Sequence, residues 1–470
     1  MEFLEPQSLA DAVHEKIYYI RLLLAGYEAE LPAATCVDFV KSIRLVLTAV
    51  EDYHSEWQTY LASAWPQDLE IRSDLVRSTS KIALAILRNI ERDLLPSLRS
   101  SLLQSPYLIK QMMERVIAPV ASAKDIELTL VPTFDYVYGF SGTLDIAASL
   151  VEKLGGYRNK QQHLAEAAAL PKWTVFLSFP LVEYESALNQ VVLAHELAHL
   201  LTHLQDLPSK LKPFTLDETS FVALVAEVNE SPLRYFAVPL TTPEEIEQHC
   251  YEVCSKMVES WMQEIMADLI AVHALGPAYF LSFLEFLAHS SADDVPDRTH
   301  PAPSYRCSRV LEELSFMEYS SIQTEISRFL WRSHDQIESS ATLAIKRHQG
   351  PELVAHATVA VKLEGIRALV RDLCKDFSYK ASKYINEVAP LAHSLSKGLV
   401  PMDAYREGRN LEPLSPVAIL NAGAEVYATQ WTAFQSLFVG SLGRPEHLQN
   451  LNRLIFKALE LNEVVRAFHS

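Results

Sequence analysis

Apolar residues recur at helical spacing along most of the chain. Within residues 7–115 the clearest stretches are SLADAVHEKIYYIRLLLAGYEAEL, CVDFVKSIRLVLTAVEDYHSEWQTYLASAW and SDLVRSTSKIALAILRNIERDLL. Each has apolar side chains three or four positions apart, which places them on one face of a helix. Residues 303–395 show the same pattern, and 396–470 contain two further helical stretches between loops marked by glycine and proline. The pattern predicts a mainly helical protein.

One region breaks the helical pattern. IELTLVPTFDYVYGFSG, at 126–142, alternates and is rich in β-branched and aromatic residues, and WTVFLSFPLVEY, at 173–184, is a second strand candidate. We therefore expect a small β-sheet, which makes the fold class mainly α with some α+β character. Pro180 favours an edge position for the second strand, because proline donates no backbone hydrogen bond. Such an edge would either pair with an extended peptide or be purely structural, and both alternatives stay open.

Residues 243–275 have the best-marked helix ends in the chain. Thr242 can cap the helix, Pro243 fits its first turn, and Glu245 completes a capping box. The Gly-Pro pair at 276–277 should end the helix. We predict a helix from 243 to 275.

Length and composition favour several packed helical regions. The chain has 470 residues, too many for one ordinary core, and only 13 glycines, which disfavours a fold with many tight turns. Its 49% hydrophobic and 21% charged residues are typical of a globular protein. We expect an N-terminal helical region at 1–120, a central region with the sheet at 121–310 and a C-terminal helical region at 311–470.

Charge and cysteine usage narrow the partners and the compartment. The net charge of −18 repels phosphate backbones, so we expect no nucleic-acid partner. The chain has no stretch of 18 uncharged apolar residues, so we expect no membrane span. The N-terminus MEFLEPQSLADAVHEK lacks the pattern of a signal peptide. The 5 cysteines are odd in number and scattered, which favours free thiols in the cytoplasm.

Candidate chemistry lies in VVLAHELAHLLTHLQD, at 191–206. His195 and His199 are four positions apart on one helix face, so their ring nitrogens can bind a single Zn²⁺. Glu196 is displaced by about 100° around the helix axis, a position suited to a general base acting on water that the metal has acidified. Ordinary hydrogen bonds of histidines inside a core are the alternative.

A catalytic zinc site needs a third protein ligand. Thr202 and Gln205 replace the glycine and last histidine of the pattern H-E-x-x-H-x-x-G-x-x-H, which excludes a third histidine of that kind. His203 lies one turn beyond His199, too far along the face to share the metal. The third ligand must therefore come from another segment.

The sequence ESWMQEIMADLIAVHAL offers a carboxylate pair, Glu264 and Asp268, four positions apart among apolar residues. Two carboxylates that face an interior repel each other unless a cation or a donor neutralises them. Glu264 would ligate the metal, and Asp268 would accept the N–H of a ligating histidine and fix its tautomer.

HELAH followed by EIMAD resembles the gluzincin clan of zinc metallopeptidases, whose pattern is H-E-x-x-H with a downstream E-x-x-x-D. The resemblance covers about residues 170–310. It implies a zincin-like metallopeptidase core between helical flanking regions. It also implies the site residues: the Zn²⁺ ligands His195, His199 and Glu264, the catalytic base Glu196 and the orienting Asp268.

A third segment, DRTHPAPSYRCSRVLEEL, is similar to the H-P-x-x-x-x-R segment of the membrane CAAX-processing and heat-shock metalloproteases of that clan. The similarity implies that His300 and Arg306 lie near the zinc, where they would stabilise the transition-state oxyanion. Alternatively, they tie the next helix to the active-site helix. Unlike those relatives, this chain has no predicted membrane span.

These observations predict a zinc-dependent metalloprotease that hydrolyses a protein or peptide substrate. A regulatory protein or ligand would then act through the helical flanks. The alternative is a helical interaction or regulatory scaffold whose metal site is structural or vestigial, and the large helical flanks motivate it.

Overall fold

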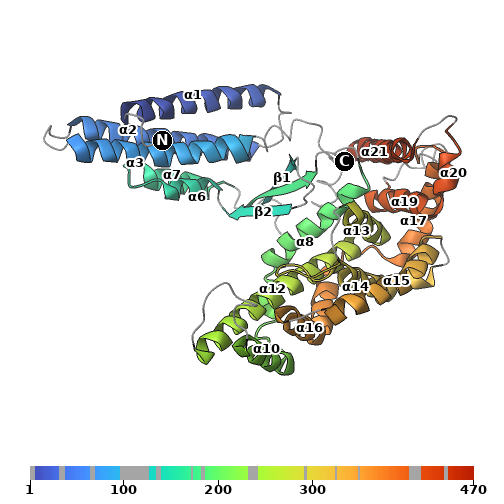
Figure 1. The fold of residues 1–470 in the computed structure, drawn as a ribbon. Coiled ribbons are helices and arrows are strands. Elements are labelled where there is room, and N and C mark those ends of the chain that lie inside the picture. The colour runs from blue at the N-terminus through green and yellow to red at the C-terminus, as the bar shows by residue number, and fades with distance from the viewer. Residues whose placement is uncertain are drawn as a thin grey trace. The chain divides into compact units, whose positions relative to one another are not determined.

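In the computed structural model, the chain divides into two units (Figure 1). Unit 1 comprises Met1–Tyr107 and Ala121–Leu181, and unit 2 comprises Leu108–Val120 and Val182–Ser470. This division differs from the three expected regions, because 121–181 groups with the N-terminal helices and 182–310 with the C-terminal ones. The described residues are 6–30, 37–63, 69–95, 126–133, 139–144, 146–170, 173–180, 186–230, 242–289, 294–322, 325–347, 350–401, 414–438 and 443–469.

Unit 1 is built on long helices whose apolar faces pack together. The helices are α1 (Pro6–Glu30), α2 (Val37–Ser63), α3 (Leu69–Asn89), α6 (Ile146–Lys153) and α7 (Lys160–Ala168), and a π-helical turn, Ile90–Leu94, extends α3. Each of the three long helices contributes apolar side chains to one core, such as the fully buried Ile20 of α1, Ile43 of α2 and Leu87 of α3. The predicted helices are confirmed as far as Leu95, and residues 96–125 lie outside the described part of the chain.

A three-stranded sheet completes unit 1. Its strands are β1 (Ile126–Thr133), β2 (Gly139–Leu144) and β3 (Trp173–Pro180), in the order β1-β3-β2. β3 pairs in parallel with β1 and antiparallel with β2, so it is the central strand. The predicted edge position of this strand is therefore wrong, and so is peptide pairing along it. Pro180 is the last residue of β3, where the missing N–H interrupts no further pairing.

The expected zincin-like core with a small β-sheet is wrong. The sheet belongs to unit 1, whereas the segments HELAH and EIMAD belong to unit 2. Among the described residues of unit 2 there are helices and turns but no strand, and the described protein is almost entirely helical. The physical reason is that the strands pair with one another inside unit 1, while other helices of unit 2 pack against the HELAH helix.

Unit 2 is a packed array of helices around one central helix, α12 (Pro243–Leu275) (Figure 1). Helices α8, α10, α13, α14 and α16 all contact α12. The other helices of unit 2 are α8 (Leu193–Leu204), α9 (Leu207–Lys210), α10 (Glu218–Glu230), α13 (Pro277–His289), α14 (Pro303–Phe316), α15 (Glu325–Arg347), α16 (Pro351–Cys374), α17 (Ala381–Ser396), α19 (Pro416–Thr429), α20 (Trp431–Gln435) and α21 (Arg444–His469), with 3₁₀ turns at Asn189–Val192 and Tyr319–Ser321.

The predicted ends of α12 are confirmed. The Thr242 hydroxyl accepts a hydrogen bond from the Glu245 N–H at 3.2 Å, and the Glu245 carboxylate accepts one from the Thr242 N–H at 3.2 Å. The helix ends at Gly276, whose φ of +63° suits glycine, and a Cβ there would lie 2.8 Å from the Tyr319 hydroxyl. Since almost every side chain in the C-terminal half of α12 is buried, polar groups on it need partners inside the unit.

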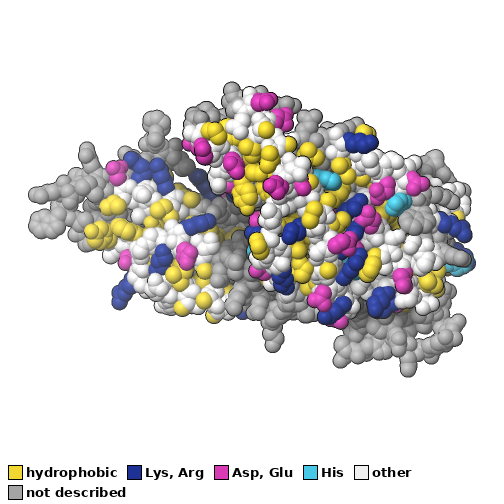
Figure 2. Space-filling model, turned by 90° about the horizontal axis from the view of Figure 1, so that it is seen from below, with side chains coloured by type: hydrophobic (Ala, Val, Ile, Leu, Met, Phe, Trp, Pro, Cys, Tyr) yellow, Lys and Arg dark blue, Asp and Glu magenta, His cyan; other side chains and the backbone are white. Residues whose placement is uncertain are grey.

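The surface and the helix lengths add two observations. On the face drawn in Figure 2, Lys and Arg side chains are interspersed with acidic and apolar ones. Among the described helices, none is long and apolar enough to cross a membrane.

Candidate metal site

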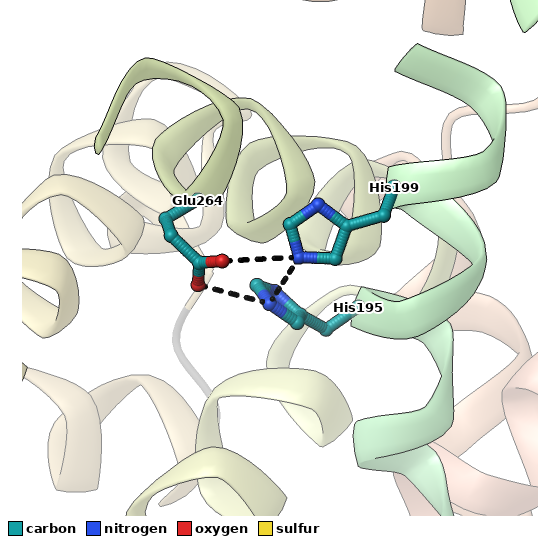
Figure 3. Close-up of side chains that lie close together, drawn as sticks. All are labelled: His195, His199 and Glu264. Atoms are coloured by element: carbon teal, nitrogen blue, oxygen red, sulfur yellow. Dashed lines mark hydrogen bonds and ion pairs between the residues drawn. The ribbon is translucent and has the colours of Figure 1, made fainter. Parts of the chain in front are cut away.

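Helices α8 and α12 pack against each other and bring three predicted ligands together (Figure 3). His195 and His199 project from one face of α8, as their spacing predicts, and Glu264 projects toward them from α12. Their ligand atoms all lie within 4.8 Å of one another. Among the described residues, this is the group of histidine, cysteine and carboxylate side chains with the spacing of a metal site.

The distances between these atoms suit a small tetrahedral cation. Nε2 of His195 and Nε2 of His199 are 3.0 Å apart, and each is 3.2 Å from an oxygen of Glu264. Ligand atoms at about 2.0–2.1 Å from a tetrahedral zinc ion are separated by roughly 3.3 Å. The three side chains thus need only small shifts to hold zinc.

The chemistry of the donor set also fits a cation. Glu264 is only 8% exposed, and its Oε2 is buried without accepting a hydrogen bond from any described residue. The guanidinium of Arg306, 3.1 Å away, forms an ion pair with this oxygen without hydrogen-bond geometry. A buried carboxylate oxygen that accepts no well-formed hydrogen bond is costly, and a metal ion bound between it and Nε2 of His195, 3.2 Å away, would remove that cost.

Asp268 lies one turn beyond Glu264 on α12 and faces the other side of the His195 ring. Its Oδ1 is 2.9 Å from Nδ1 of His195, and the carboxylate is 1% exposed. In the neutral, metal-binding form of His195, this contact favours the proton on Nδ1 and leaves Nε2, the atom nearest Glu264, with its lone pair. The geometry is that of the orienting role predicted for Asp268.

Arg306 is buried and ties α14 to α12. Its Nε donates to Oδ2 of Asp268 at 2.7 Å, its Nη2 donates to Oδ1 at 2.8 Å, and its guanidinium stacks 4.8 Å from the ring centre of Phe283. Of the two alternatives for Arg306, this arrangement favours the tie between helices, because the donors already face Asp268 and Glu264.

His300 faces the cluster from a turn before α14. Its Nε2 is 3.8 Å from Oε1 of Glu264, and half of the side chain is exposed. The Asp297 carboxylate fixes the turn by accepting hydrogen bonds from the N–H groups of Thr299 and His300, at 2.6 and 2.7 Å. Of the two residues from the H-P-x-x-x-x-R segment, His300 is the one on the solvent side of the cluster.

Within the cluster, His195 and Arg306 compensate the charges of the two carboxylates. Burial by itself lowers the pKa of His195, but the carboxylates of Asp268 and Glu264 outweigh it and raise this pKa to about 10. Burial by itself raises the pKa values of Glu264 and Asp268, but Arg306 and His195 hold both well below their usual range. A proton on His195 thus supplies positive charge that a bound metal ion would otherwise supply.

Glu196 and His203 share α8 with the two histidine ligands but not their surroundings. Glu196 is partly exposed, and no hydrogen bond or ion pair joins it to another described residue. His203 is exposed and lies outside the cluster, as expected from its position one turn beyond His199. The role of Glu196 as a base stays a prediction.

Sequence reasoning missed Tyr279. This residue of α13 is fully buried, and its hydroxyl donates to Oδ1 of Asp268 at 2.6 Å. The only signal for it was its place two residues after Pro277 of the Gly-Pro pair, in the first turn of α13. A helical pattern does not reveal which polar group a buried tyrosine meets.

The comparisons with known proteins add no relative. No family model matches the chain, and neither the search of curated proteins nor the search of solved structures found a match.

Proposed function

We propose that this chain is a zinc-dependent peptidase that hydrolyses peptide bonds with Glu196 as general base. The observation that carries the proposal is the convergence of His195, His199 and Glu264, from two helices far apart in sequence, on one point. Glu196 follows the first ligand directly and is partly exposed. The resemblance of HELAH and EIMAD to gluzincin motifs supports the same assignment.

Each protein group has a distinct part in this proposal. A zinc ion held by the three ligands would lower the pKa of a water molecule and polarise the substrate carbonyl. Glu196 accepts a proton from the attacking water and passes it to the leaving amine. His300, half exposed beside Glu264, would donate to the developing oxyanion, and Arg306 would keep Glu264 and Asp268 in place.

The direct test is the variant Glu196→Gln, assayed for cleavage of a peptide library and for zinc content. We expect cleavage to fall by about 10²–10⁴-fold, because the amide cannot take the proton. Zinc content should stay at the level of the unaltered chain, since Glu196 is not a ligand. Full cleavage by this variant would contradict the mechanism.

A scaffold with a vestigial site is the second candidate, and one observation favours it. Arg306 and a protonated His195 already balance Glu264 and Asp268, so the cluster is charge-compensated without a metal. Elemental analysis after purification without chelators separates the two candidates. The peptidase requires about one zinc per chain, and a chain that takes up no zinc even from added zinc salt would be the scaffold.

A further inference from the structure

Tyr279 stands at the point where the chain reverses after the central helix. Gly276 ends α12, and α13 begins at Pro277, with the Tyr279 N–H bonded to the Gly276 carbonyl at 3.2 Å. The reversal directs the Tyr279 ring back along α12 to Asp268. The side chain is fully buried, and its ring stacks on Phe283 with the centroids 5.8 Å apart.

The hydroxyl of Tyr279 has one close acceptor. It donates to Oδ1 of Asp268 at 2.6 Å and lies 3.5 Å from Nδ1 of His195. The phenol stays protonated, because burial and then the charge of Asp268 raise its pKa well above the usual value. A buried hydroxyl loses free energy without a partner, so this bond fixes ring and carboxylate together.

Three donors converge on the same oxygen. Besides Tyr279, Oδ1 of Asp268 faces Nη2 of Arg306 at 2.8 Å and Nδ1 of His195 at 2.9 Å, while Oδ2 takes Nε of Arg306 at 2.7 Å. Arg306 approaches the carboxylate from α14 and Tyr279 from α13, so the two hold it between them. With Oδ1 held in this way, the His195 ring has one favourable orientation, with Nε2 toward His199 and Glu264.

We propose that Tyr279 is a positioning residue for the metal site, which sets zinc affinity by fixing Asp268 and, through it, the ring of His195. The inference rests on the proposed zinc site and adds a residue outside the gluzincin motifs. Removing an orienting partner of a metal ligand typically weakens metal binding by about 10–100-fold.

The test is Tyr279→Phe, which keeps the ring and removes only the hydroxyl. We expect its zinc Kd, measured by competition with a chromogenic chelator, to rise by about 10–100-fold. Tyr384→Phe is the matched control, because Tyr384 is also fully buried in unit 2 and donates to a buried carboxylate, Glu425, at 2.8 Å. The control should bind zinc with the Kd of the unaltered chain. Equal affinities of Tyr279→Phe and the control would overturn the inference.

Two further measurements separate positioning from general destabilisation. In the background of Asp268→Asn, the change Tyr279→Phe should add less than about twofold to the zinc Kd, because the hydroxyl acts through that carboxylate. In the unaltered zinc-loaded chain, ¹⁵N-edited spectra should show the His195 proton on Nδ1, and a proton on Nε2 would overturn the ligand assignment on which the inference rests. An unaltered chain that binds no zinc would overturn the proposed function and this inference together, whereas normal zinc binding by Tyr279→Phe would overturn only the inference.

Discussion

Two buried clusters bridge α12 and α14, and they use the same residue types. In the first, His195 of α8 meets Asp268 and Glu264 of α12 and Arg306 of α14. In the second, His273 of α12 meets Glu313 of α14, which accepts two hydrogen bonds from Arg371 of α16, both at 2.8 Å. Histidine, carboxylate and arginine alone therefore do not define a site.

The clusters differ in whether donors and acceptors balance. Both ring nitrogens of His273 have partners, Glu313 at 2.9 Å and the Ser378 hydroxyl at 2.9 Å. Glu313 is fully buried, and the hydrogen bonds from His273 and Arg371 outweigh its burial and hold its pKa at about 2. In the first cluster Nε2 of His195 lies 3.0 Å from Nε2 of His199 and 3.2 Å from Oε2 of Glu264, and this oxygen accepts no hydrogen bond from any described residue. Three side chains that turn their ligand atoms toward one point are what a metal ion needs, and of the two clusters the first has this geometry.

The largest expected effect separates the two clusters by metal content. His195→Ala removes a ligand and should abolish stoichiometric zinc binding, whereas His273→Ala should leave one zinc per chain. His203→Ala is the control on α8, since His203 is exposed and outside the cluster. Elemental analysis of the three variants checks this, and zinc retained by His195→Ala would refute the ligand assignment.

A second expected effect concerns the contribution of the His273–Glu313–Arg371 cluster to stability. Arg371→Met leaves the fully buried Glu313 without its bidentate partner, so the free energy of unfolding should fall by about 3–5 kcal/mol. Denaturant unfolding measures this change. The control Lys375→Met removes an exposed ion pair with Asp372 of the same helix end and should cost at most about 1 kcal/mol. Zinc content should stay the same in both variants.

A third effect extends the comparison to a buried histidine without a carboxylate. His54 of unit 1 is fully buried, its Nδ1 has no hydrogen-bond partner among the described residues, and burial followed by the charge of His14 lowers its pKa to about 4. Because this folded-state pKa lies below the unfolded value of about 6.5, stability is complete above pH 6.5 and falls as the pH drops toward 4. The loss should be at most about 3 kcal/mol.

Thermal unfolding between pH 7 and pH 4, compared with that of His54→Phe, measures this contribution. The variant should lose less stability on acidification than the unaltered chain. Identical pH profiles would show that protonation of His54 does not change stability. The contrast between His54, whose pKa is lowered, and His195, which two carboxylates keep charged, would then be wrong.

The smallest expected effect tests whether the two clusters depend on the far end of their shared helix. Thr242→Ala removes the N-cap of α12 and should lower the free energy of unfolding by about 1 kcal/mol. Zinc affinity should not change, because the capping box lies several turns away from Glu264 on α12. A large loss of zinc in this variant would mean that the site depends on the whole helix and not on its local contacts.

Several features could be predicted because they depend on neighbours along the chain. The ends of α12 follow from Thr242, Glu245 and Gly276, whose effects act within one helical turn. The shared face of His195 and His199 follows from the helical repeat. Strand positions near 126–133 and 173–180 also followed from composition, whereas the pairing of β3 on both sides did not, since register depends on the partner strands.

By itself, the sequence determined the helical character, the limits of α12 and the side chains able to bind a metal, because propensity, capping and periodicity are local. Only the tertiary structure decided that Glu264 reaches the two histidines, that the sheet belongs to the other unit, and that Tyr279 completes the support of Asp268. Likewise, only packing gave both ring nitrogens of His273 a partner and left Oε2 of Glu264 without a hydrogen bond from any described residue. Those outcomes depend on which surfaces bury one another, and no interaction within a single segment specifies that choice.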